Sequence, residues 1–433
     1  MHAIIIGAGP AGLAAALALH KQSNDTPSAP AIRITVLERR PNITLEISGG
    51  GQLGGAINLT PLALRYLDAL GVGKRLRPRG AKVSSIEMIS HRTGTPLGKL
   101  WPNVDALRVA RQQVVECLAE TISESPEISI RHGVRIAKIE QVGDADGKGE
   151  VKVHLTSGQG DEENEVIEGD FLLGCDGIHS HVKSTVVDPG RKKEYSGRAA
   201  AYGYVRLDEP GETGVMMADG TPAIRDSSMV MGARGTLLMT FFEPSRTRVY
   251  VAGVISAPEE EVAAAEDGRK AVGRDKESLK RDMLRRFEGG GFTGLEELVA
   301  KCQEWFFFPV YMLPNGGVWS KGRVLLLGDA AHAMPPQGES TGVAIEDGVL
   351  LAHVFSRRGN RSVAAMFADY EKLRRDVIKK LYDQTMFRWA DAGDKPLWKS
   401  VVMDWVMWVV LLVMNYSSKD HFARDVRKLE LPA

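Results

Sequence analysis

The sequence predicts an α/β protein in which a unit built on a parallel sheet is interrupted by an antiparallel-sheet domain and followed by helices. Three observations predict this class. The chain opens with a strand, a glycine turn, a helix and a second strand; it changes to strands of antiparallel character between about residues 187 and 314; and its last third is helical. With 433 residues it is long enough for two or three domains.

The first forty residues form the predicted strand, turn, helix and strand. An apolar strand leads into Gly7-Ala8-Gly9-Pro10-Ala11-Gly12, and an apolar helix follows from Leu13 to His20. A second apolar run, residues 32–37, ends in Glu38. The polar stretch 22–30, rich in Ser, Asn, Asp and Pro, is interpreted as a loop insertion between the helix and the second strand.

The three glycines of this turn each have a physical task. Gly7 permits the tight turn, Gly9 lets the backbone approach a pyrophosphate, and Gly12 lets the helix pack closely on the strand. The helix N-terminus can then hold the anion, and Glu38 can hydrogen-bond a ribose hydroxyl. A lone motif of this kind is weak evidence, but the strand before it, the helix after it and the acidic strand end supply its context. The sequence therefore predicts a Rossmann-like dinucleotide site.

Charge and cysteine content exclude several other classes. Lys plus Arg equals Asp plus Glu at 55 each, so net charge indicates neither a nucleic-acid nor an acidic-membrane partner. Cys117, Cys175 and Cys302 are odd in number and lack CxxC spacing, which argues against a disulfide framework and a zinc site. A reducing, cytoplasmic compartment fits best. The N-terminal apolar stretch has no basic leader, so we expect no secretion signal. We also expect no bound metal.

The segment after Glu38 contains further glycines and helices. Residues 47–56 are dense in glycine, as expected where backbone passes close to a ligand. Thr60-Pro61 opens a predicted helix that stops at Gly71, and 106–122 is predicted to be another helix, with Arg111 near its start. Short strand-like runs between 128 and 155 suggest a β-meander.

The middle of the chain has the pattern of an inserted domain. Residues 199–207, 235–242 and 247–255 are predicted antiparallel strands, and 276–288 a charged helix. The first unit returns with residues 323–327, which are predicted to be a fully buried strand.

Near the C-terminus, residues 405–414 are ten consecutive apolar residues. This is well short of the roughly 20 residues needed to cross a bilayer. We therefore expect a helix packed on the body of the protein. A membrane-surface anchor stays open as the alternative, because the run includes Trp405 and Trp408, and tryptophan is common at membrane interfaces.

Three separated segments place glycines and an acid at the end of a buried strand, where the ligand of an open α/β sheet binds. Besides the first turn, these are Gly174-Cys175-Asp176-Gly177-Ile178-His179-Ser180-His181-Val182-Lys183 and Gly328-Asp329-Ala330-Ala331-His332-Ala333-Met334-Pro335-Pro336, the latter followed by Gly338 to Gly342. In motif, order and spacing the chain resembles the group A flavin-dependent monooxygenases, which include para-hydroxybenzoate hydroxylase and salicylate hydroxylase.

The resemblance implies FAD as cofactor and a role for each motif. Asp176 would be shared between the FAD pyrophosphate and the nicotinamide donor, Asp329 would contact the ribityl chain, and Pro335 would lie beside the reactive edge of the flavin. The residues assigned to FAD in this way are Gly7, Gly9, Gly12, Glu38, Arg39, Gly54, Gly55, Arg111, Asp176, Gly328, Asp329, Gly338, Thr341 and Gly342. Simpler interpretations are that Asp176 and Asp329 are helix N-caps and that His332 is structural.

The implied fold is that of para-hydroxybenzoate hydroxylase, with a discontinuous FAD-binding domain. The FAD-binding domain would comprise residues 1–75, 100–186 and 315–358. The substrate-binding β-sheet domain would comprise residues 76–99 and 187–314, and residues 359–433 would form the C-terminal helical region. The implied reaction uses NADPH or NADH to reduce FAD, and O2 then forms a flavin C4a-hydroperoxide that transfers one oxygen to an electron-rich small molecule. Fungal secondary-metabolite oxygenases are similar, and hydroxylation, epoxidation and Baeyer-Villiger insertion all stay open.

Two other functions are alternatives. A flavin-dependent reductase or halogenase could use the same fold, although the halogenase pattern WxWxIP is absent and the nearest text is Trp305-Phe306-Phe307-Phe308-Pro309. A non-catalytic binding module of the GDP-dissociation-inhibitor type is also possible, although Asp176 and Asp329 argue against it.

Substrate-side residues are expected from the inserted domain. Tyr202, Tyr204 and Arg206 share one face of a predicted strand. Met239 and Phe241 share one face of another. The two tyrosines are candidates for holding or deprotonating the substrate, and plain packing in the sheet is an equal alternative. Glu339 stands where the family usually has glutamine. Because a buried carboxylate beside a reduced flavin would be costly, we expect Glu339 to point away or to pair.

Overall fold

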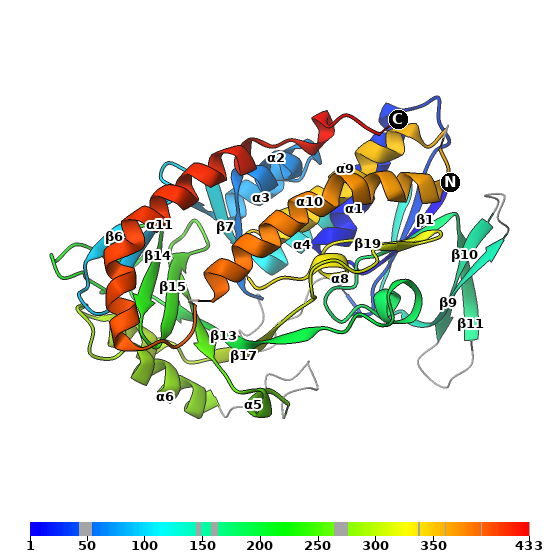
Figure 1. Ribbon diagram of the computed structural model, residues 1–433. Helices are drawn as coiled ribbons and strands as arrows, with labels where there is room; N and C mark the ends of the chain where they lie inside the picture. The colour runs from blue at the N-terminus through cyan, green and yellow to red at the C-terminus, as the bar shows by residue number, and fades with distance from the viewer. Residues whose placement is uncertain are drawn as a thin grey trace.

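The computed structural model describes residues 1–42, 54–143, 149–156, 163–263, 276–336, 338–359, 361–390 and 392–432. Two sheet-based parts lie side by side, and two long C-terminal helices run along both (Figure 1). Most of the glycine-dense stretch, residues 47–53, lies outside the described residues.

The first part is built on a six-stranded sheet whose order confirms the predicted opening unit. The order is β18 (Ser320–Lys321), β19 (Val324–Leu326), β12 (Phe171–Gly174), β1 (His2–Ile6), β2 (Arg33–Leu37) and β8 (Ile128–Arg131). All pairs are parallel except β18 with β19. Helix α1 (Pro10–Asp25) packs against α9 (Ser340–Val354). The three glycine-bearing turns therefore emerge at the carboxyl ends of the adjacent strands β1, β12 and β19.

The predicted meander is only partly correct. Its first strand, β8, joins the main parallel sheet beside β2. A separate three-stranded antiparallel sheet contains β9 (Arg135–Gly143), β10 (Gly149–Thr156) and β11 (Glu163–Gly169).

The predicted helix 106–122 is wrong in its first five residues, which form the central strand of a small sheet. Its strands are β3 (Ala56–Leu59), β7 (Ala106–Ala110) and β4 (Ala81–Val83), with β7 in the centre. Residues 106–110 are all buried and pair on both sides, so tertiary pairing overrides their helical pattern. Helix α4 (Arg111–Ile122) begins only at Arg111. Helix α2 (Pro61–Ala69) confirms the helix opened by Thr60-Pro61.

The second part is a seven-stranded sheet that contains the predicted antiparallel strands. Its order is β17 (Trp305–Met312), β13 (Glu194–Arg206), β16 (Arg248–Ser256), β15 (Gly235–Phe241), β14 (Ser227–Gly232), β5 (Ile86–Ser90) and β6 (Pro96–Leu100). One face packs on helices α5 (Glu259–Ala263), α6 (Lys276–Phe287) and α7 (Leu295–Lys301). Residues 239 and 241 belong to that helix-covered core, so the expectation that they face the substrate is wrong.

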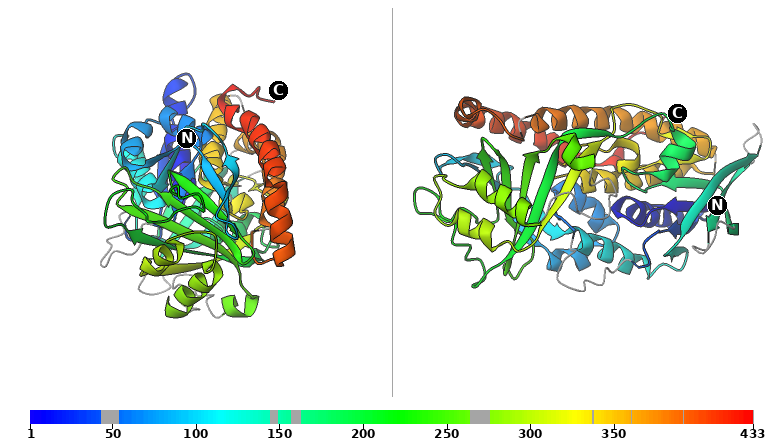
Figure 2. Two further views of the ribbon diagram at one scale, coloured as in Figure 1. Left: turned by 90° about the vertical axis from the view of Figure 1, so that its left-hand side faces the viewer. Right: turned by 90° about the horizontal axis from the view of Figure 1, so that it is seen from below.

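The C-terminal region consists mainly of α10 (Val363–Trp389) and α11 (Leu397–Ala423). Helix α11 lies along the outer flank of the molecule in each view (Figures 1 and 2). It packs against β6, and Met407 and Leu411 are buried there. Its other face is exposed and apolar: Leu397, Trp398, Val402, Trp405, Val406, Trp408, Val409, Leu412, Val413 and Tyr416. The expected packing is therefore confirmed for one stripe only. By length and composition alone, α11 is also long enough to cross a membrane.

The shorter elements are α3 (Gly73–Leu76), α8 (Asp329–His332) and single turns at Arg77–Arg79, Lys183–Val187, Phe355–Arg357 and Val426–Lys428.

Candidate active site

The first glycine turn has the close contacts that the motif predicts. Gly7 has a φ of 106°, and a Cβ there would lie 2.5 Å from the carbonyl oxygen of Cys175. A Cβ on Gly12 would lie 2.0 Å from the carbonyl oxygen of Gly7. Gly9 is the N-cap of α1 and offers no side chain to its first N–H groups. The start of α1 therefore presents unsatisfied amides to an anion.

Glu38 is held at the end of β2 as an ionised acceptor. Its carboxylate is 8% exposed and accepts from the backbone N–H of Ala8 at 2.8 Å and of Arg40 at 2.9 Å. Burial would raise its pKa, but these bonds and the Arg40 guanidinium, whose Nε lies 3.0 Å away, lower it. Arg39 is exposed, so the neighbouring basic residue that contacts Glu38 is Arg40.

Arg111 and Asp329 face one another from different strand ends. A Cβ on Gly9 would lie 3.9 Å from Arg111 Nη2, and a Cβ on Gly54 would lie 3.4 Å from Arg111 Cβ. Burial lowers the pKa of Arg111, and the charge of Asp329 partly opposes this. Burial likewise raises the pKa of Asp329. Both side chains nevertheless keep a large accessible surface. This combination is expected of charged groups that line a recess in the protein.

In the second motif, one carboxylate oxygen of Asp176 accepts hydrogen bonds from the backbone and the other has no partner. Its Oδ2 accepts from the backbone N–H of His181 at 2.7 Å and of Val182 at 3.2 Å. Its Oδ1 is buried and has no hydrogen-bond partner. Burial raises the pKa of Asp176, and the hydrogen bonds partly oppose that rise. The helical turn begins at His181, and Ser180 caps it, with its Oγ accepting from the backbone N–H of Lys183 at 2.9 Å, so the N-cap interpretation of Asp176 is wrong. Asp176 binds the first amides of that turn from the preceding loop, and its Oδ1 is left as a buried acceptor that a bound group could satisfy.

The third motif is pressed against α1 and α9. Gly328 has a φ of 60°, and a Cβ there would lie 3.1 Å from the Cβ of Ala11. His332 Nε2 lies 2.8 Å from Asp347 Oδ2, so the structural interpretation of His332 is confirmed. Pro335 is buried. A Cβ on Gly342 would lie 2.9 Å from that of Ala63, which explains the glycine where α9 crosses α2.

The loop after Pro335 contains the other predicted FAD-binding residues. Thr341 is half-buried, and Gly338 has a φ of 83°. Gly55 is approached by Tyr250, whose hydroxyl would lie 3.2 Å from a Cβ at that position. Glu339 pairs as expected, with its Oε2 2.9 Å from His421 Nε2 at the end of α11.

A buried charge network beneath the third motif was not anticipated. Glu346 and Asp347, both 0% exposed, lie on α9 and flank Arg374 of α10. Arg424 Nε and the Tyr66 hydroxyl both donate to Glu346 Oε1 at 3.0 Å. Two acidic residues within an otherwise apolar helix were the available signal, because buried charges need partners. The network ties the C-terminal segment to the floor of the site.

The two predicted tyrosines belong to a cluster of rings that we call the aromatic wall. It consists of Tyr202 and Tyr204 of β13, Phe242 just after β15, Tyr250 of β16 and Phe308 of β17. Tyr202 stacks on Phe308 with ring centroids 5.4 Å apart and lies 5.5 Å from Tyr250. Tyr204 lies 5.2 Å from Phe242, and its hydroxyl donates to the carbonyl of Gly54. Burial raises the pKa of Tyr202 to about 12, although Arg111 opposes the rise. Burial also raises the pKa of Tyr204. Both tyrosines are therefore protonated at neutral pH and can donate hydrogen bonds, but they are poor bases.

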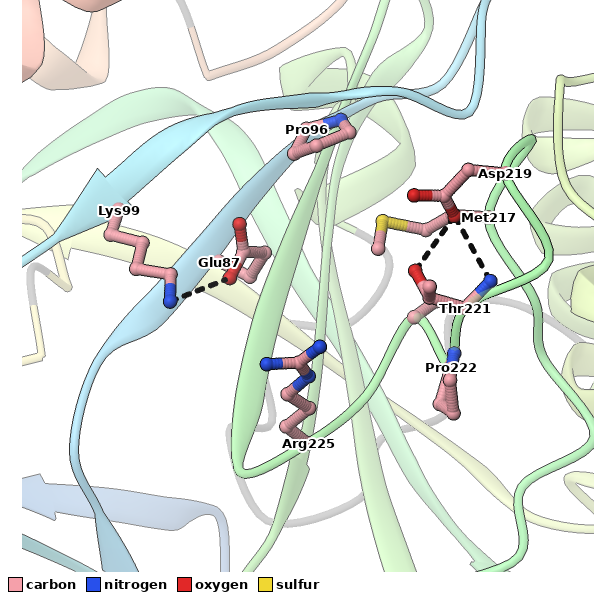
Figure 3. Close-up of a pocket in the computed structure, with 9 residues that line it drawn as sticks. Glu87, Pro96, Lys99, Met217, Asp219, Thr221, Pro222 and Arg225 are labelled. Atoms are coloured by element: carbon pink, nitrogen blue, oxygen red, sulfur yellow. Dashed lines mark hydrogen bonds and ion pairs between the residues drawn. The ribbon is translucent and has the colours of Figure 1, made fainter.

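A separate surface pocket of about 200 Å³ lies between β5, β6 and the loop 217–225 (Figure 3). Three of its charged side chains have local partners: Lys99 Nζ lies 3.8 Å from Glu87 Oε2, and Asp219 accepts from Thr221. Its lining contains none of the three glycine motifs and no aromatic ring. We assign no role to it.

Comparison with known proteins agrees with the geometry of the three motifs. Residues 1–206 and 317–385 match the FAD binding domain family. The FAD-dependent urate hydroxylase of Klebsiella pneumoniae is 26% identical over 88% of this chain and 88% of its own length. Salicylate hydroxylase of Pseudomonas putida is 26% identical, with 86% of this chain and 81% of the relative covered.

Solved structures show the same fold. The crystal structure of Klebsiella pneumoniae HpxO complexed with FAD and uric acid has a TM-score of 0.68 at 21% identity, with 96% and 93% of the two chains covered. Native FqzB has a TM-score of 0.70 at 20% identity, with 99% and 94% covered. The family match covers more than half of the chain, so this protein belongs to the FAD binding domain family and is a group A FAD-dependent monooxygenase.

Proposed function

We propose that this monooxygenase uses NADPH or NADH and O2 to insert one oxygen atom into an electron-rich aromatic small molecule, including secondary metabolites. The observation that carries the proposal is the aromatic wall, whose Tyr204 contacts Gly54 and whose Tyr250 approaches Gly55. Ring stacking favours aromatic ligands. The related enzymes named for urate, salicylate and 6-hydroxynicotinate also act on ring compounds.

The residues present fit FAD, and we propose their roles accordingly. The amides at the start of α1 would donate to the pyrophosphate, the spare oxygen of Asp176 would accept from a hydroxyl group of the cofactor, and Glu38 would accept from the adenosine ribose. Arg111 and Asp329 would bind the central part of the cofactor, and the loop from Gly338 to Gly342 would lie against its ring. When bound, FAD supplies the electron transfer and oxygen activation.

The chain itself supplies binding, orientation and exclusion of water. Tyr202 holds the substrate by ring contact and hydrogen-bond donation, and Tyr204 by ring contact, because its hydroxyl already donates to the carbonyl of Gly54. Buried Pro335 closes the site beside the glycine loop. The division into a FAD-binding domain, a substrate domain and a C-terminal helical region, at the boundaries predicted from the sequence, is likewise proposed. The placement of β5 and β6 in the seven-stranded sheet supports it.

The test is oxygen incorporation. Purified holoenzyme is reduced anaerobically with NADPH or NADH, and ¹⁸O₂ is then added with a panel of hydroxylated aromatic compounds. We expect bleaching of the flavin absorbance and one ¹⁸O atom in a product, detected by mass spectrometry. Reduction without any labelled product would refute the monooxygenase proposal and favour a reductase.

We also propose that this enzyme is cytoplasmic and that it binds a membrane surface through the exposed face of α11. That face carries Trp398, Trp405, Trp408 and Tyr416, and tryptophan and tyrosine favour membrane interfaces. Flotation with neutral phosphatidylcholine vesicles tests this. Binding that is lost in Trp405→Ser/Trp408→Ser supports it. A concentration-dependent dimer that does not float contradicts it and identifies the face as a contact between copies.

A further inference from the structure

Arg108 is a buried cation whose charge no carboxylate balances in the described parts of the chain. It lies in β7 and is 3% exposed. Its Nη2 donates to Ser227 Oγ at 3.3 Å, and its Nε has no hydrogen-bond partner. Burial lowers its pKa to about 10, with Tyr250 opposing the shift, so Arg108 is charged at neutral pH. Such a group is costly to bury unless something completes its hydrogen bonds.

Asn58 presents a second unsatisfied polar group beside it. Asn58 and Arg108 are directly opposed in the antiparallel pair β3–β7, so their side chains lie on one face of the sheet. Asn58 is 3% exposed, and neither its Oδ1 nor its Nδ2 has a partner. A Cβ on Gly338 would lie 4.0 Å from Asn58 Cβ, which places this face beside the glycine loop of the FAD site.

The same sheet face also meets the aromatic wall. Ala56 and Ala110, which alternate with Asn58 and Arg108 along β3 and β7, pack in one cluster with Phe242 and Tyr250. Asn58 and Arg108 therefore lie between the glycine loop and the rings that we propose to hold the substrate.

Arg374 is a buried arginine with a structural role, and its partners differ from those of Arg108. Its Nε lies 2.7 Å from Asp347 Oδ1, and it also pairs with Glu346. Buried polar groups are almost always satisfied in folded proteins. Within the described chain the Asn58 amide has no partner and the Arg108 guanidinium has only Ser227, so these two adjacent side chains point to a ligand.

We propose that Arg108 and Asn58 form a subsite for a carboxylate on the substrate, so that the enzyme takes aromatic acids in preference to neutral rings. This inference rests on the proposed function and narrows its substrate class. The guanidinium would bind the carboxylate through paired N–H donors, and the Asn58 amide would donate a further hydrogen bond. The bound anion would also balance the buried charge, so a substrate without a carboxylate would leave both residues unsatisfied.

The test compares benzoate with benzamide, its neutral analogue of nearly the same shape. Each is titrated into oxidised holoenzyme while the flavin absorbance is followed. We expect benzoate to bind at least about tenfold more tightly than benzamide, because hydrogen bonds to a charged group are the stronger ones. Arg108→Met should weaken benzoate binding by about 30-fold and leave benzamide within about threefold. Asn58→Ala should have a smaller effect in the same direction. Any result without a benzoate preference in the wild type overturns the proposal.

Two controls separate this role from folding and from the proposed function. Arg135→Met removes an exposed cation from β9, in the separate three-stranded sheet, and should not change the benzoate preference. Arg108→Met should melt at the wild-type temperature or above, because it removes an unbalanced buried charge. A markedly lower melting temperature would show that Arg108 is structural and overturn the subsite. A wild-type enzyme that incorporates ¹⁸O but binds benzoate no better than benzamide overturns the subsite alone, whereas failure of ¹⁸O incorporation overturns the proposed function.

Discussion

Replacing Arg374 by methionine tests the buried network beneath the FAD site. Arg374 is 1% exposed and contacts Asp347 and Glu346, each 0% exposed, and its Nη2 donates to the carbonyl of Val343 at 2.9 Å. The substitution keeps a long apolar side chain but removes the cation. Asp347 then keeps His332 and Glu346 keeps Arg424, so each carboxylate loses one of its partners.

The expected cost follows from breaking a buried ion pair. Removing one partner of such a pair destabilises a protein by about 3–5 kcal/mol, because a buried charge is left uncompensated. A loss of about 4 kcal/mol changes the unfolding equilibrium by about a thousandfold. With an unfolding entropy of about 2.1 cal/mol/K per residue, a chain of this length should melt about 4 °C lower.

Thermal melting at pH 7.5 and pH 5 is the assay. The matched control is Arg375→Met, one residue along α10, where a half-buried guanidinium pairs with Glu371 and the loss should be below about 1 kcal/mol. Without Arg374, the pKa values of the two buried carboxylates rise, so the penalty should shrink as acidification protonates them. Equal melting of the two variants, or a penalty that does not change with pH, would refute the charge argument.

Three further predictions concern the cofactor and acid stability. Asp329→Ala should weaken FAD binding by at least about tenfold, measured as the flavin-to-protein absorbance ratio after purification; full stoichiometric flavin would contradict the proposed role. Arg111→Ala should weaken FAD binding to a similar extent without lowering the melting temperature of the flavin-free protein, because the hydrogen bond that Arg111 makes within the described chain is from its backbone N–H to Gly55 O, which the substitution keeps. Burial would raise the pKa of Asp347, but His332 and Arg374 outweigh it and lower that pKa from 3.8 to about 2. Its contribution is therefore complete above about pH 4 and should be lost between pH 4 and 2, with a smaller loss in Asp347→Asn.

The sequence predicted the glycine turns well because their requirements are local. Gly7, Gly12 and Gly328 are needed where backbone passes within contact distance of backbone or of a packed helix, and that need follows from the strand, turn and helix around each. The antiparallel strands of the second sheet were likewise visible from the alternation of their residues. The start of α4 was misplaced because β7 is a strand only through its neighbours β3 and β4.

Arg108 and Asn58 show why part of the site could not be predicted. Each belongs to a short segment without a motif, and their proximity arises from an antiparallel pairing between residues about fifty positions apart. The same holds for Tyr250 beside Tyr202, and for Glu346 beside Arg374 and Arg424. The tyrosines were named from the sequence, but only the structure shows that burial raises the pKa of both hydroxyls and so disfavours a role in deprotonating the substrate.

By itself the sequence determined the FAD-binding architecture, because three strand-end turns each carry glycines at positions of close contact or positive φ. Tertiary structure alone decided which charges are balanced. It surrounds Arg374 with two carboxylates and leaves Arg108 with none in the described chain, although both are buried arginines. It also decided that α11 buries one narrow stripe and exposes a row of aromatic and aliphatic side chains. The reason is physical: the free energy of a charge or an apolar surface depends on what long-range packing places beside it.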